Sequence, residues 1–329
     1  MVCPGCTVEI DESALSCPQC RRLTHVNELE DLAGKAHAAW RIGDFAAERR
    51  LWEESLKLLP PDTVQYRSIE NRLAELEQQF AAAAPAHGGG WKKVSAGVGP
   101  ALLLLLTKGK VLLLGLTKLG TLLTMFAAFG VYWTMFGWAF AAGLVLSIYI
   151  HEMGHVVALR GYGFPATAPM FIPGLGAFIR LRGVKVPPIP DNRIGLAGPL
   201  YGLGAAAAAM ALFAATRAHI WSALAHFGAV VNLFNLIPVW QLDGSRAFHS
   251  LTRRQRGLIL VLAVVLWIFT SNPMLFLIAA VAAWRMFTRD WQSEPDSGGM
   301  IRFAAIMAAL ALVGALSPVE HVVPTTATR

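Results

Sequence analysis

The stretch from Gly137 to His155 reads GWAFAAGLVLSIYIHEMGH, an apolar run that ends in an H-E-x-x-H motif. With its flank, the apolar part is long enough to cross a bilayer as a helix. In a helix His151 and His155 lie on one face, where both imidazoles can bind one metal ion, and Glu152 stands beside them. Ionisable groups at this depth usually line a polar cavity, and Zn²⁺ would compensate for their burial. The alternative is a chance match on a partly buried helix, so the motif alone favours zinc without proving it.

The composition is that of a membrane protein with a soluble head. The chain has 329 residues, of which 55% are hydrophobic and only 15% are charged. Residues 1 to about 80 are charged and mixed, whereas the chain from about residue 98 onward consists mostly of apolar spans. The net charge of +7 could indicate nucleic-acid binding, but the arginines cluster between apolar spans, which fits the positive-inside rule better. Nucleic acid is therefore not an expected partner. The first ten residues, MVCPGCTVEI, predict no cleaved signal peptide.

All four cysteines lie in the first 20 residues, in two C-P-x-C pairs. Each pair offers two thiolates from one tight turn, and two such turns close a tetrahedral structural zinc site. Two disulfides or a free redox pair are the alternatives, but a chain without a cleaved leader keeps these thiols in a reducing compartment. The four expected ligands are Cys3, Cys6, Cys17 and Cys20.

Residues 25–80 change to the pattern of two or three amphipathic helices. Gly43-Asp44-Phe45, followed by Trp52, Leu56, Leu58 and Pro60, resembles the second helix of a tetratricopeptide repeat. Glu48 stands where that repeat normally has alanine. Because a lone repeat cannot bury its own face, a helix from Thr63 to Phe80 is expected to cap it. This head is either a docking platform for a protein partner or a helical spacer, and residues 81–98 are expected to link it to the membrane.

The remainder predicts a mostly α, polytopic membrane bundle of about six to seven spans, the domain covering residues 119–318 before a tail at 319–329. Residues 99–118 carry three lysines on an apolar segment and predict a separate interfacial amphipathic helix. Three basic loops alternate with nearly uncharged ones, which places the basic loops and the cysteine-rich head in the cytoplasm. A multi-pass protein of a prokaryotic cytoplasmic membrane is expected. The spans are expected near residues 119–135, 137–159, 193–216, 220–242, 256–270, 274–288 and 302–317.

A third metal ligand is expected at the end of the fourth span. The sequence from Asn235 to Gly244 reads NLIPVWQLDG, and in the orientation above it ends on the same side as the H-E-x-x-H motif. Asp243 supplies the carboxylate that two histidines lack, which leaves a fourth position open. In isolation an Asp-Gly turn is the simpler interpretation. Because the zinc motif is expected at the same depth, we favour the interpretation of Asp243 as a metal ligand.

These motifs together resemble the site-2 protease family of intramembrane zinc metalloproteases. The resemblance covers about residues 120 to 250 and rests on the H-E-x-x-H helix, the Ala197-Gly198-Pro199-Leu200 sequence and the N-x-x-P-x-x-x-L-D-G of residues 235–244. Gly202 departs from it, because relatives often carry asparagine there. A bulky Trp240 before Asp243 is a second departure. Both departures bear on substrate preference more than on activity.

The resemblance implies a function and a set of site residues. His151, His155 and Asp243 would bind catalytic zinc, and Glu152 would be the general base. Residues 171–179 resemble the family's membrane-dipping β-hairpin, whose edge can pair with an unwound substrate. The implied reaction is hydrolysis of peptide bonds within or near transmembrane helices. The implied substrate-binding residues are Asn235, Pro238, Gly176 and Ala177.

Other functions remain open at this point. A pseudoprotease that binds membrane helices would need a lost base or ligand, yet both histidines, Glu152 and Asp243 are present. A membrane protease acting on soluble or lipidated chains would want a third ligand from a Glu-bearing helix. A transporter would show broken helices in repeated halves, and the sequence has no such internal repeat. The expected partners are a transmembrane protein substrate and the lipid bilayer, and the expected cofactors are one catalytic and one structural Zn²⁺.

Overall fold

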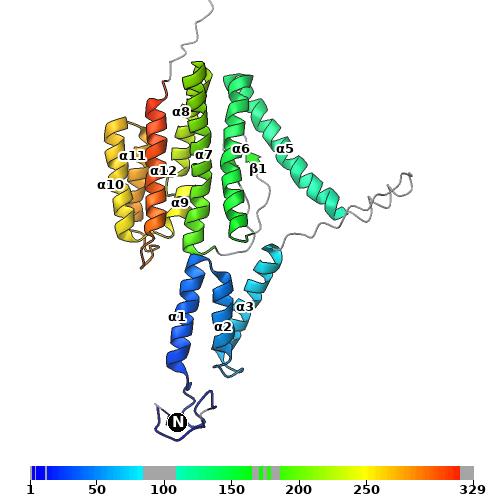
Figure 1. The fold of residues 1–329 in the computed structure, drawn as a ribbon, viewed down its shortest axis with the longest axis vertical. Coiled ribbons are helices and arrows are strands. Elements are labelled where there is room, and N and C mark those ends of the chain that lie inside the picture. Colours follow the sequence, from blue (N-terminus) through cyan, green and yellow to red (C-terminus); the bar gives the residue numbers. More distant parts are fainter. Residues whose placement is uncertain are drawn as a thin grey trace, which may run out of the picture. The chain divides into compact units, whose positions relative to one another are not determined.

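The computed structural model describes residues 2–3, 5–11, 13–83, 109–164, 170–172, 176–178 and 186–318. Over these residues the fold is mostly helical (Figure 1). The chain divides into two compact units, one formed mainly by Met1–Pro85 and the other by most of the remaining residues. Each unit is described by itself. The expected linker lies outside the described residues from residue 84 onward.

Three helices follow the cysteine turns in the first unit: α1 (Val26–Ile42), α2 (Phe45–Leu56) and α3 (Val64–Ala83). Gly43 ends α1 with a φ of +82°, a left-handed conformation that glycine adopts without strain. The Asp44 side chain then accepts a hydrogen bond from the Ala47 N–H and caps α2. The Gly-Asp-Phe sequence is therefore a real helix–turn–helix, and α2 packs against both α1 and α3. Its likeness to a tetratricopeptide repeat stays a prediction.

Glu48, the residue that stands in the alanine position of the repeat pattern, has a partner on α3. Its side chain is only 3% exposed, and its two carboxylate oxygens accept hydrogen bonds from Arg72 Nε at 2.8 Å and Arg72 Nη2 at 3.1 Å. The Trp52 indole N–H lies 3.3 Å from the same carboxylate. This bidentate pair joins α3 to α2 and accounts for an acidic side chain in the helical core.

We predict that Arg72→Ala loosens the head by about 3 kcal/mol, because it leaves the Glu48 carboxylate buried without its countercharge. Hydrogen exchange of α2 and α3 in the full-length protein measures the change. The matched control is Arg49→Ala, which breaks a pair with Glu53 in which both side chains are 45% exposed, so solvent screens the pair and its loss should leave the protection of α2 and α3 nearly unchanged. Equal protection of α2 and α3 in both variants would contradict this account of Glu48.

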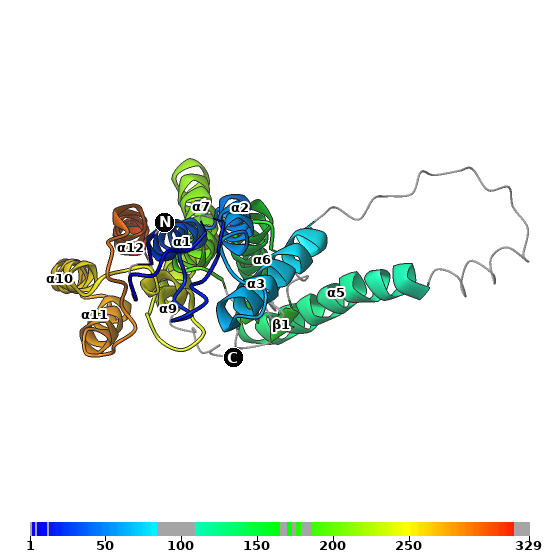
Figure 2. The same ribbon diagram turned by 90° about the horizontal axis from the view of Figure 1, so that it is seen from below.

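The second unit is a bundle of helices with one short sheet. In Figures 1 and 2 helices α6, α7, α10, α11 and α12 run roughly along a common direction, whereas α5 lies at an angle to them. The largest apolar core joins α8, α9, α10, α11 and α12, with Phe248 of α9 packed edge-on against Phe303 of α12. The helices are α5 (Gly109–Phe136), α6 (Trp138–Gly161), α7 (Pro188–Thr216), α8 (His219–Asn235), α9 (Asp243–Phe248), α10 (Arg253–Thr270), α11 (Pro273–Arg285) and α12 (Ser297–Leu316).

Within the described residues, three helices are long and apolar enough to cross a membrane: α6, α7 and α12. Six to seven spans are therefore not confirmed. The expected span at 220–242 differs most, because α8 ends at Asn235 and a non-helical loop follows. Pro238 lies in that loop, and proline disfavours helical backbone at the residue before it. The span expected at 119–135 lies within α5, whose segment Leu122–Phe136 is apolar, and the span expected at 274–288 corresponds to the shorter apolar helix Pro273–Arg285.

A second difference concerns the segment expected to form an interfacial helix at 99–118. One continuous helix, α5, runs from Gly109 to Phe136 and has no break at Lys118. Its sequence contains no proline, and leucine and lysine are both good helix formers, so nothing local ends a helix there. The expected boundary between an interfacial helix and the first span was wrong in this respect. Residues 99–108 lie outside the described residues.

Two short strands, β1 (Met170–Ile172) and β2 (Gly176–Phe178), lie within the segment expected to form the β-hairpin. They pair antiparallel, with Phe171 opposite Ala177 and Ile172 opposite Gly176. Residues 173–175 lie outside the described residues. The structure therefore gives the backbone register of the two strands. That they form a membrane-dipping hairpin stays a prediction.

Candidate metal centre

The H-E-x-x-H residues lie in the middle of the apolar helix α6. His151, Glu152 and His155 are each between 5% and 6% exposed. The i, i+4 spacing places both imidazoles on one helix face, and their Nε2 atoms lie 3.2 Å apart. The structure therefore brings both predicted histidine ligands together.

Asp243 completes the group from the first residue of α9. Its Oδ2 lies 3.1 Å from His151 Nε2, and its Oδ1 lies 3.1 Å from His155 Nε2. Tetrahedral Zn²⁺ with ligand bonds of about 2.0–2.1 Å separates its ligand atoms by about 3.3 Å. The three ligand atoms have nearly this spacing, so the residues fit a zinc ion with three protein ligands.

The hydrogen bonds on the far side of each ring decide which nitrogen faces the site. His151 Nδ1 lies 2.8 Å from Asn232 Oδ1, and His155 Nδ1 lies 2.8 Å from the backbone carbonyl of Ile194. Both partners are acceptors, so each Nδ1 carries a proton, and in the neutral imidazole each Nε2 keeps its lone pair. Two lone pairs and a carboxylate then point at one another, which is unfavourable unless a cation lies among them.

Helix α7 approaches this group so closely that only glycine fits. A Cβ at Gly198 would lie 2.2 Å from His155 Nε2 and 2.6 Å from His151 Nε2. Gly154 of α6, which directly precedes His155, is also close to α7: a Cβ there would lie 2.4 Å from the Ala197 carbonyl oxygen. The glycine of the Ala197–Leu200 motif thus keeps side-chain atoms out of the space among the ligands.

A cavity of about 620 Å³ opens from the three ligands and Glu152. Large apolar side chains of α5, α6 and α8 form much of its wall, including Phe136, Ile148 and Phe227. The polar groups are concentrated around His151 and Asp243. The cavity therefore combines an apolar wall with a polar end at the candidate ligands.

The predicted substrate-binding residues have different positions. Asn235 lines the cavity, with its Nδ2 3.4 Å from His151 Nε2. Pro238 is buried and lies outside the set of residues that line the cavity, and its carbonyl accepts a hydrogen bond from Arg285. Gly176 and Ala177 lie in β2, so only their backbone register is described. Trp240 is 84% exposed in the loop before Asp243, with a φ of +52° that is uncommon for a bulky residue.

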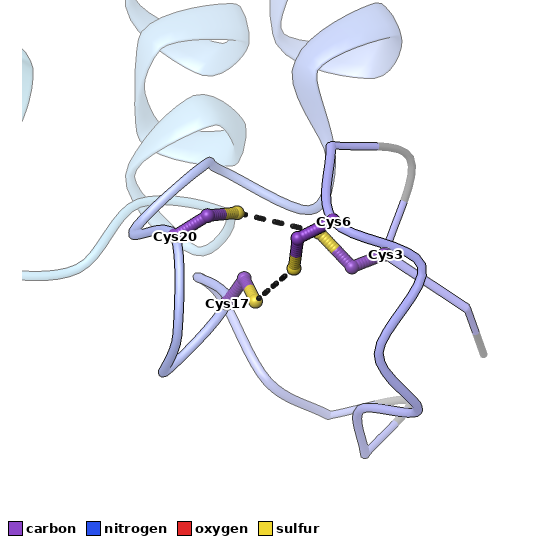
Figure 3. Close-up of side chains that lie close together, drawn as sticks. All are labelled: Cys3, Cys6, Cys17 and Cys20. Carbon is purple, nitrogen blue, oxygen red and sulfur yellow. Dashed lines mark hydrogen bonds between the residues drawn. The ribbon is translucent and has the colours of Figure 1, made fainter.

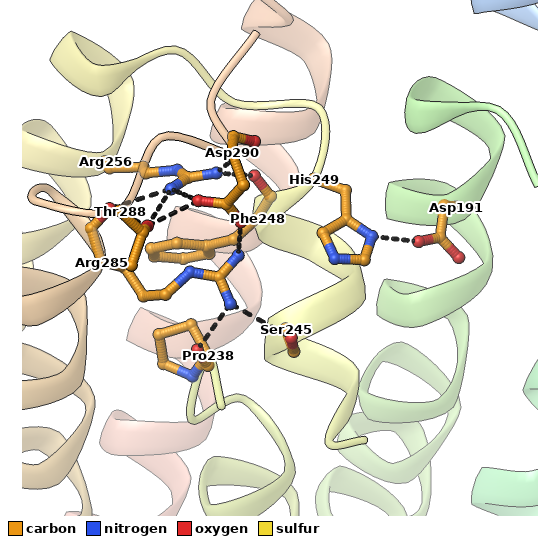
Figure 4. Close-up of polar contacts among 9 residues, drawn as sticks. All are labelled: Asp191, Pro238, Ser245, Phe248, His249, Arg256, Arg285, Thr288 and Asp290. Atoms are coloured by element: carbon orange, nitrogen blue, oxygen red, sulfur yellow. Dashed lines mark hydrogen bonds and ion pairs between the residues drawn. The ribbon is translucent and has the colours of Figure 1, made fainter. Parts of the chain in front are cut away.

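Buried hydrogen bonds hold the short helix α9, and with it Asp243, from two sides. On the α7 side, Asp191 accepts from Arg246 Nε at 2.8 Å and pairs with His249 Nδ1 at 2.6 Å, while the Asn192 amide donates to the Ala247 carbonyl. Figure 4 shows His249 and Asp191 facing each other. Helix α9 has only six residues and makes few hydrogen bonds of its own, so these contacts fix its position.

On the opposite side, two buried arginines share Asp290 (Figure 4). Arg256 donates to the Phe248 carbonyl, and Arg285 donates to Pro238 and Ser245. The arginines therefore connect α10 and α11 to both ends of the segment that carries Asp243. Partial burial disfavours the charged form of Asp290, but hydrogen bonds from Arg256 and Thr288 outweigh it and lower its pKa to about 2.

Sequence reasoning did not identify several of these residues. Asn232 had a signal, because it lies one helical turn before Asn235 and shares its face. Asp191 belongs to none of the sequence motifs. Arg256 and Arg285 belong to the basic segments that the positive-inside rule assigns to loops, whereas the structure buries them, with side chains 0% and 8% exposed.

The four cysteines form a second candidate metal site, in the first unit. Cys3 Sγ lies 3.6 Å from Cys20 Sγ, and Cys6 Sγ lies 3.5 Å from Cys17 Sγ (Figure 3). All four are free thiols rather than disulfides. A tetrahedral zinc ion with Zn–S bonds of about 2.3 Å requires sulfur separations of about 3.8 Å, close to those observed.

The cysteine turns also favour negative charge on two of the sulfurs. The Gly5 N–H donates to Cys3 Sγ and is the main reason why the pKa of Cys3 falls to about 6. Hydrogen bonding from the Cys20 backbone likewise lowers the pKa of Cys17. The Val8 backbone lowers the pKa of Cys6, but desolvation and the neighbouring sulfurs outweigh it and raise that pKa to about 12. Ionisation of all four sulfurs would therefore require a bound cation.

We predict that Asp290→Asn destabilises the second unit by about 2 kcal/mol, because two buried guanidinium groups lose their shared countercharge. The side chain of Asp290 is 43% exposed, so solvent screens its charge and the expected loss of stability is smaller than for a fully buried ion pair. Since the folded pKa lies below the ordinary value of about 3.9, the wild-type advantage is present above pH 4 and is lost as pH falls toward 2. Thermal unfolding in detergent at pH 7 and pH 3 measures this. Arg254→Ala, at an exposed arginine of α10, is the control, and equal melting of both variants at pH 7 would contradict the prediction.

Comparisons of this chain with family models, curated proteins and solved structures find no match. The metal centre is therefore interpreted from its own geometry and from the sequence motifs.

Proposed function

We propose that this protein is a zinc-dependent intramembrane endopeptidase of the site-2 protease type. The observation that carries the proposal is the convergence of His151, His155 and Asp243 within 3.2 Å, with Glu152 beside them on a helix apolar enough to cross a membrane. Two histidines and one carboxylate with an open fourth position are typical of catalytic rather than structural zinc.

A zinc ion held there would activate water and polarise the scissile carbonyl. Glu152 would accept the proton from the attacking water and return it to the leaving amine. The position of Glu152 supports this role, because it lines the same cavity as the three candidate ligands. With the base and all three ligands present, a pseudoprotease is the weaker proposal.

The proposed substrate is a transmembrane segment of another protein. The apolar wall of the cavity favours apolar side chains, and Asn235, which lines the same cavity, would hold the peptide backbone. A helical substrate shields its carbonyls, so local unwinding must precede cleavage, and helix-destabilising residues should promote it. Strands β1 and β2 offer an edge with which an unwound segment could pair.

The proposal includes one zinc ion at each site and a multi-pass topology with the head and the centre on the cytoplasmic side of a prokaryotic membrane. Basic residues between apolar segments support this orientation. The head would dock a protein partner, an idea supported by its forming a separate compact unit. The four-cysteine site would be structural, because four thiolates leave zinc no open position.

We predict that Glu152→Gln lowers peptide cleavage by at least about a thousandfold while zinc content stays unchanged, because an amide cannot accept the proton. Cleavage of a model transmembrane substrate in proteoliposomes measures the change. Glu294→Gln, at an exposed acid of the same unit, is the matched control and should retain full activity. Activity of the Glu152 variant within tenfold of wild type would refute the assignment of the base.

We predict that Asp243→Ala lowers the metal content from about two ions per chain to about one, because the membrane site loses a ligand while the cysteine site keeps all four. Elemental analysis after equilibrium dialysis measures the ratio. In the converse variant, Cys3→Ser, the remaining zinc should belong to the histidine site. Retention of two ions in Asp243→Ala would show that this carboxylate is not a ligand.

A further inference from the structure

Asn232 is a buried amide on α8 that lies against the outer nitrogen of a candidate zinc ligand. It is 2% exposed, and its Oδ1 lies 2.8 Å from His151 Nδ1. Its Nδ2 donates to the carbonyl of Gly228, one turn back on the same helix, at 2.7 Å. Every strong contact of the amide is therefore made either to its own helix or to His151.

These two contacts fix the orientation of the amide. The Gly228 carbonyl can only accept a hydrogen bond, so the nitrogen of the amide must face it and the oxygen must face His151. The oxygen in turn can only accept, so His151 Nδ1 carries the proton. Because a neutral imidazole has one protonated nitrogen, the Nε2 lone pair is left to face His155 and Asp243.

The space that Asn232 occupies exists only because α7 carries glycine opposite it. A Cβ at Gly202 would lie 2.0 Å from Asn232 Oδ1 and 2.4 Å from its Nδ2. No side chain at position 202 is compatible with the observed position of the amide. The two residues, 30 positions apart and on different helices, are therefore complementary.

The two histidines differ in how they depend on side chains. His155 donates to the Ile194 backbone carbonyl, which persists through any substitution of that residue. His151 donates to a side chain, and so its ring orientation depends on residue 232. The more vulnerable of the two ligands is the one that Asn232 supports.

We propose that Asn232 is the positioning residue of His151, and that Gly202 is the partner that admits it. Asn232 selects the Nδ1–H tautomer and fixes the plane of the ring, so that Nε2 meets the metal. This inference rests on the proposed zinc site and adds two residues that none of its motifs includes. Partners of this kind typically change metal affinity by about 10–100-fold when they are removed.

The test is cobalt binding by the purified full-length protein in detergent. Thiolate ligands give Co²⁺ an intense sulfur-to-metal charge-transfer band that nitrogen and oxygen ligands lack, so the histidine site is followed separately from the cysteine site. Asn232→Leu should weaken Co²⁺ binding at the histidine site by about 10–100-fold. Asn232→Asp keeps an acceptor and should remain within about threefold of wild type. Ser222→Ala, a buried polar residue of α8 that bonds to Pro318, is the matched control and should leave affinity unchanged.

A reciprocal exchange tests the role of Gly202. Gly202→Ala should weaken cobalt binding as Asn232→Leu does, because its Cβ displaces the amide. The double variant Gly202→Asn with Asn232→Gly offers an amide from α7 into the space vacated on α8, and should recover most of the affinity. The pairing would be overturned if the double variant bound cobalt no more tightly than the weaker-binding of its two component single variants, Gly202→Asn and Asn232→Gly.

A measurement on the unaltered protein tests the inference without requiring that the Asn232 and Gly202 variants fold. Nitrogen-15 NMR of histidine-labelled, zinc-loaded protein, with His151 assigned by comparison with His151→Gln, should show zinc on Nε2 and a hydrogen-bonded proton on Nδ1. Zinc on Nδ1, or unchanged cobalt affinity in Asn232→Leu, would overturn the inference. Failure of the wild-type histidine site to bind either metal would instead refute the proposed function and this inference together, whereas normal metal binding without peptide cleavage would refute only the peptidase.

Discussion

Two imidazole nitrogens and one carboxylate face one another within 3.2 Å inside a largely apolar bundle, and parts of α7, α8, α10 and α11 hold them in place. Without a cation this arrangement would be strongly unfavourable, because lone pairs and a negative charge are concentrated where solvent is scarce. Glycine at position 198 keeps the space among the three atoms clear, and acceptors behind each ring hold the lone pairs toward it. The protein therefore holds these side chains in the geometry that a metal ion needs.

That geometry has to be held by parts of the chain that are not themselves long helices. Asp243 begins a six-residue helix, and a non-helical loop precedes it. Such a segment has little stability of its own, so its position is set by hydrogen bonds from α7 on one side and from Arg256 and Arg285 on the other. The cost of burying two guanidinium groups is offset by Asp290 and by backbone carbonyls. Polar groups at the end of an apolar bundle thus serve to position one ligand.

The histidine pair and Asp243 could be predicted from sequence because short spacings and an apolar context constrain them. Helical spacing places His151 and His155 on one face, and the cysteine pairs of the first 20 residues form turns for similarly local reasons. The extent of the helices was harder to predict. The pattern read α8 through to residue 242, and it divided α5 at Lys118, because apolar composition by itself does not show where a helix ends. Burial of Arg285 could not be predicted, since only tertiary structure places Pro238 and Ser245 beside it.

Two departures from familiar patterns turn out to have partners far away in the sequence. Glu48 breaks the small-residue position of a helical repeat, and Arg72 on the next helix neutralises it. Gly202 departs from the motif that the sequence resembles, and Asn232 on α8 fills the space opposite it with an amide. In each case the first residue looks like a loss when it is considered alone, because the compensating group lies 24 or 30 positions later. A departure from a motif therefore indicates lost function only after the space around it has been searched, and at position 202 that space holds an amide 2.8 Å from a candidate metal ligand.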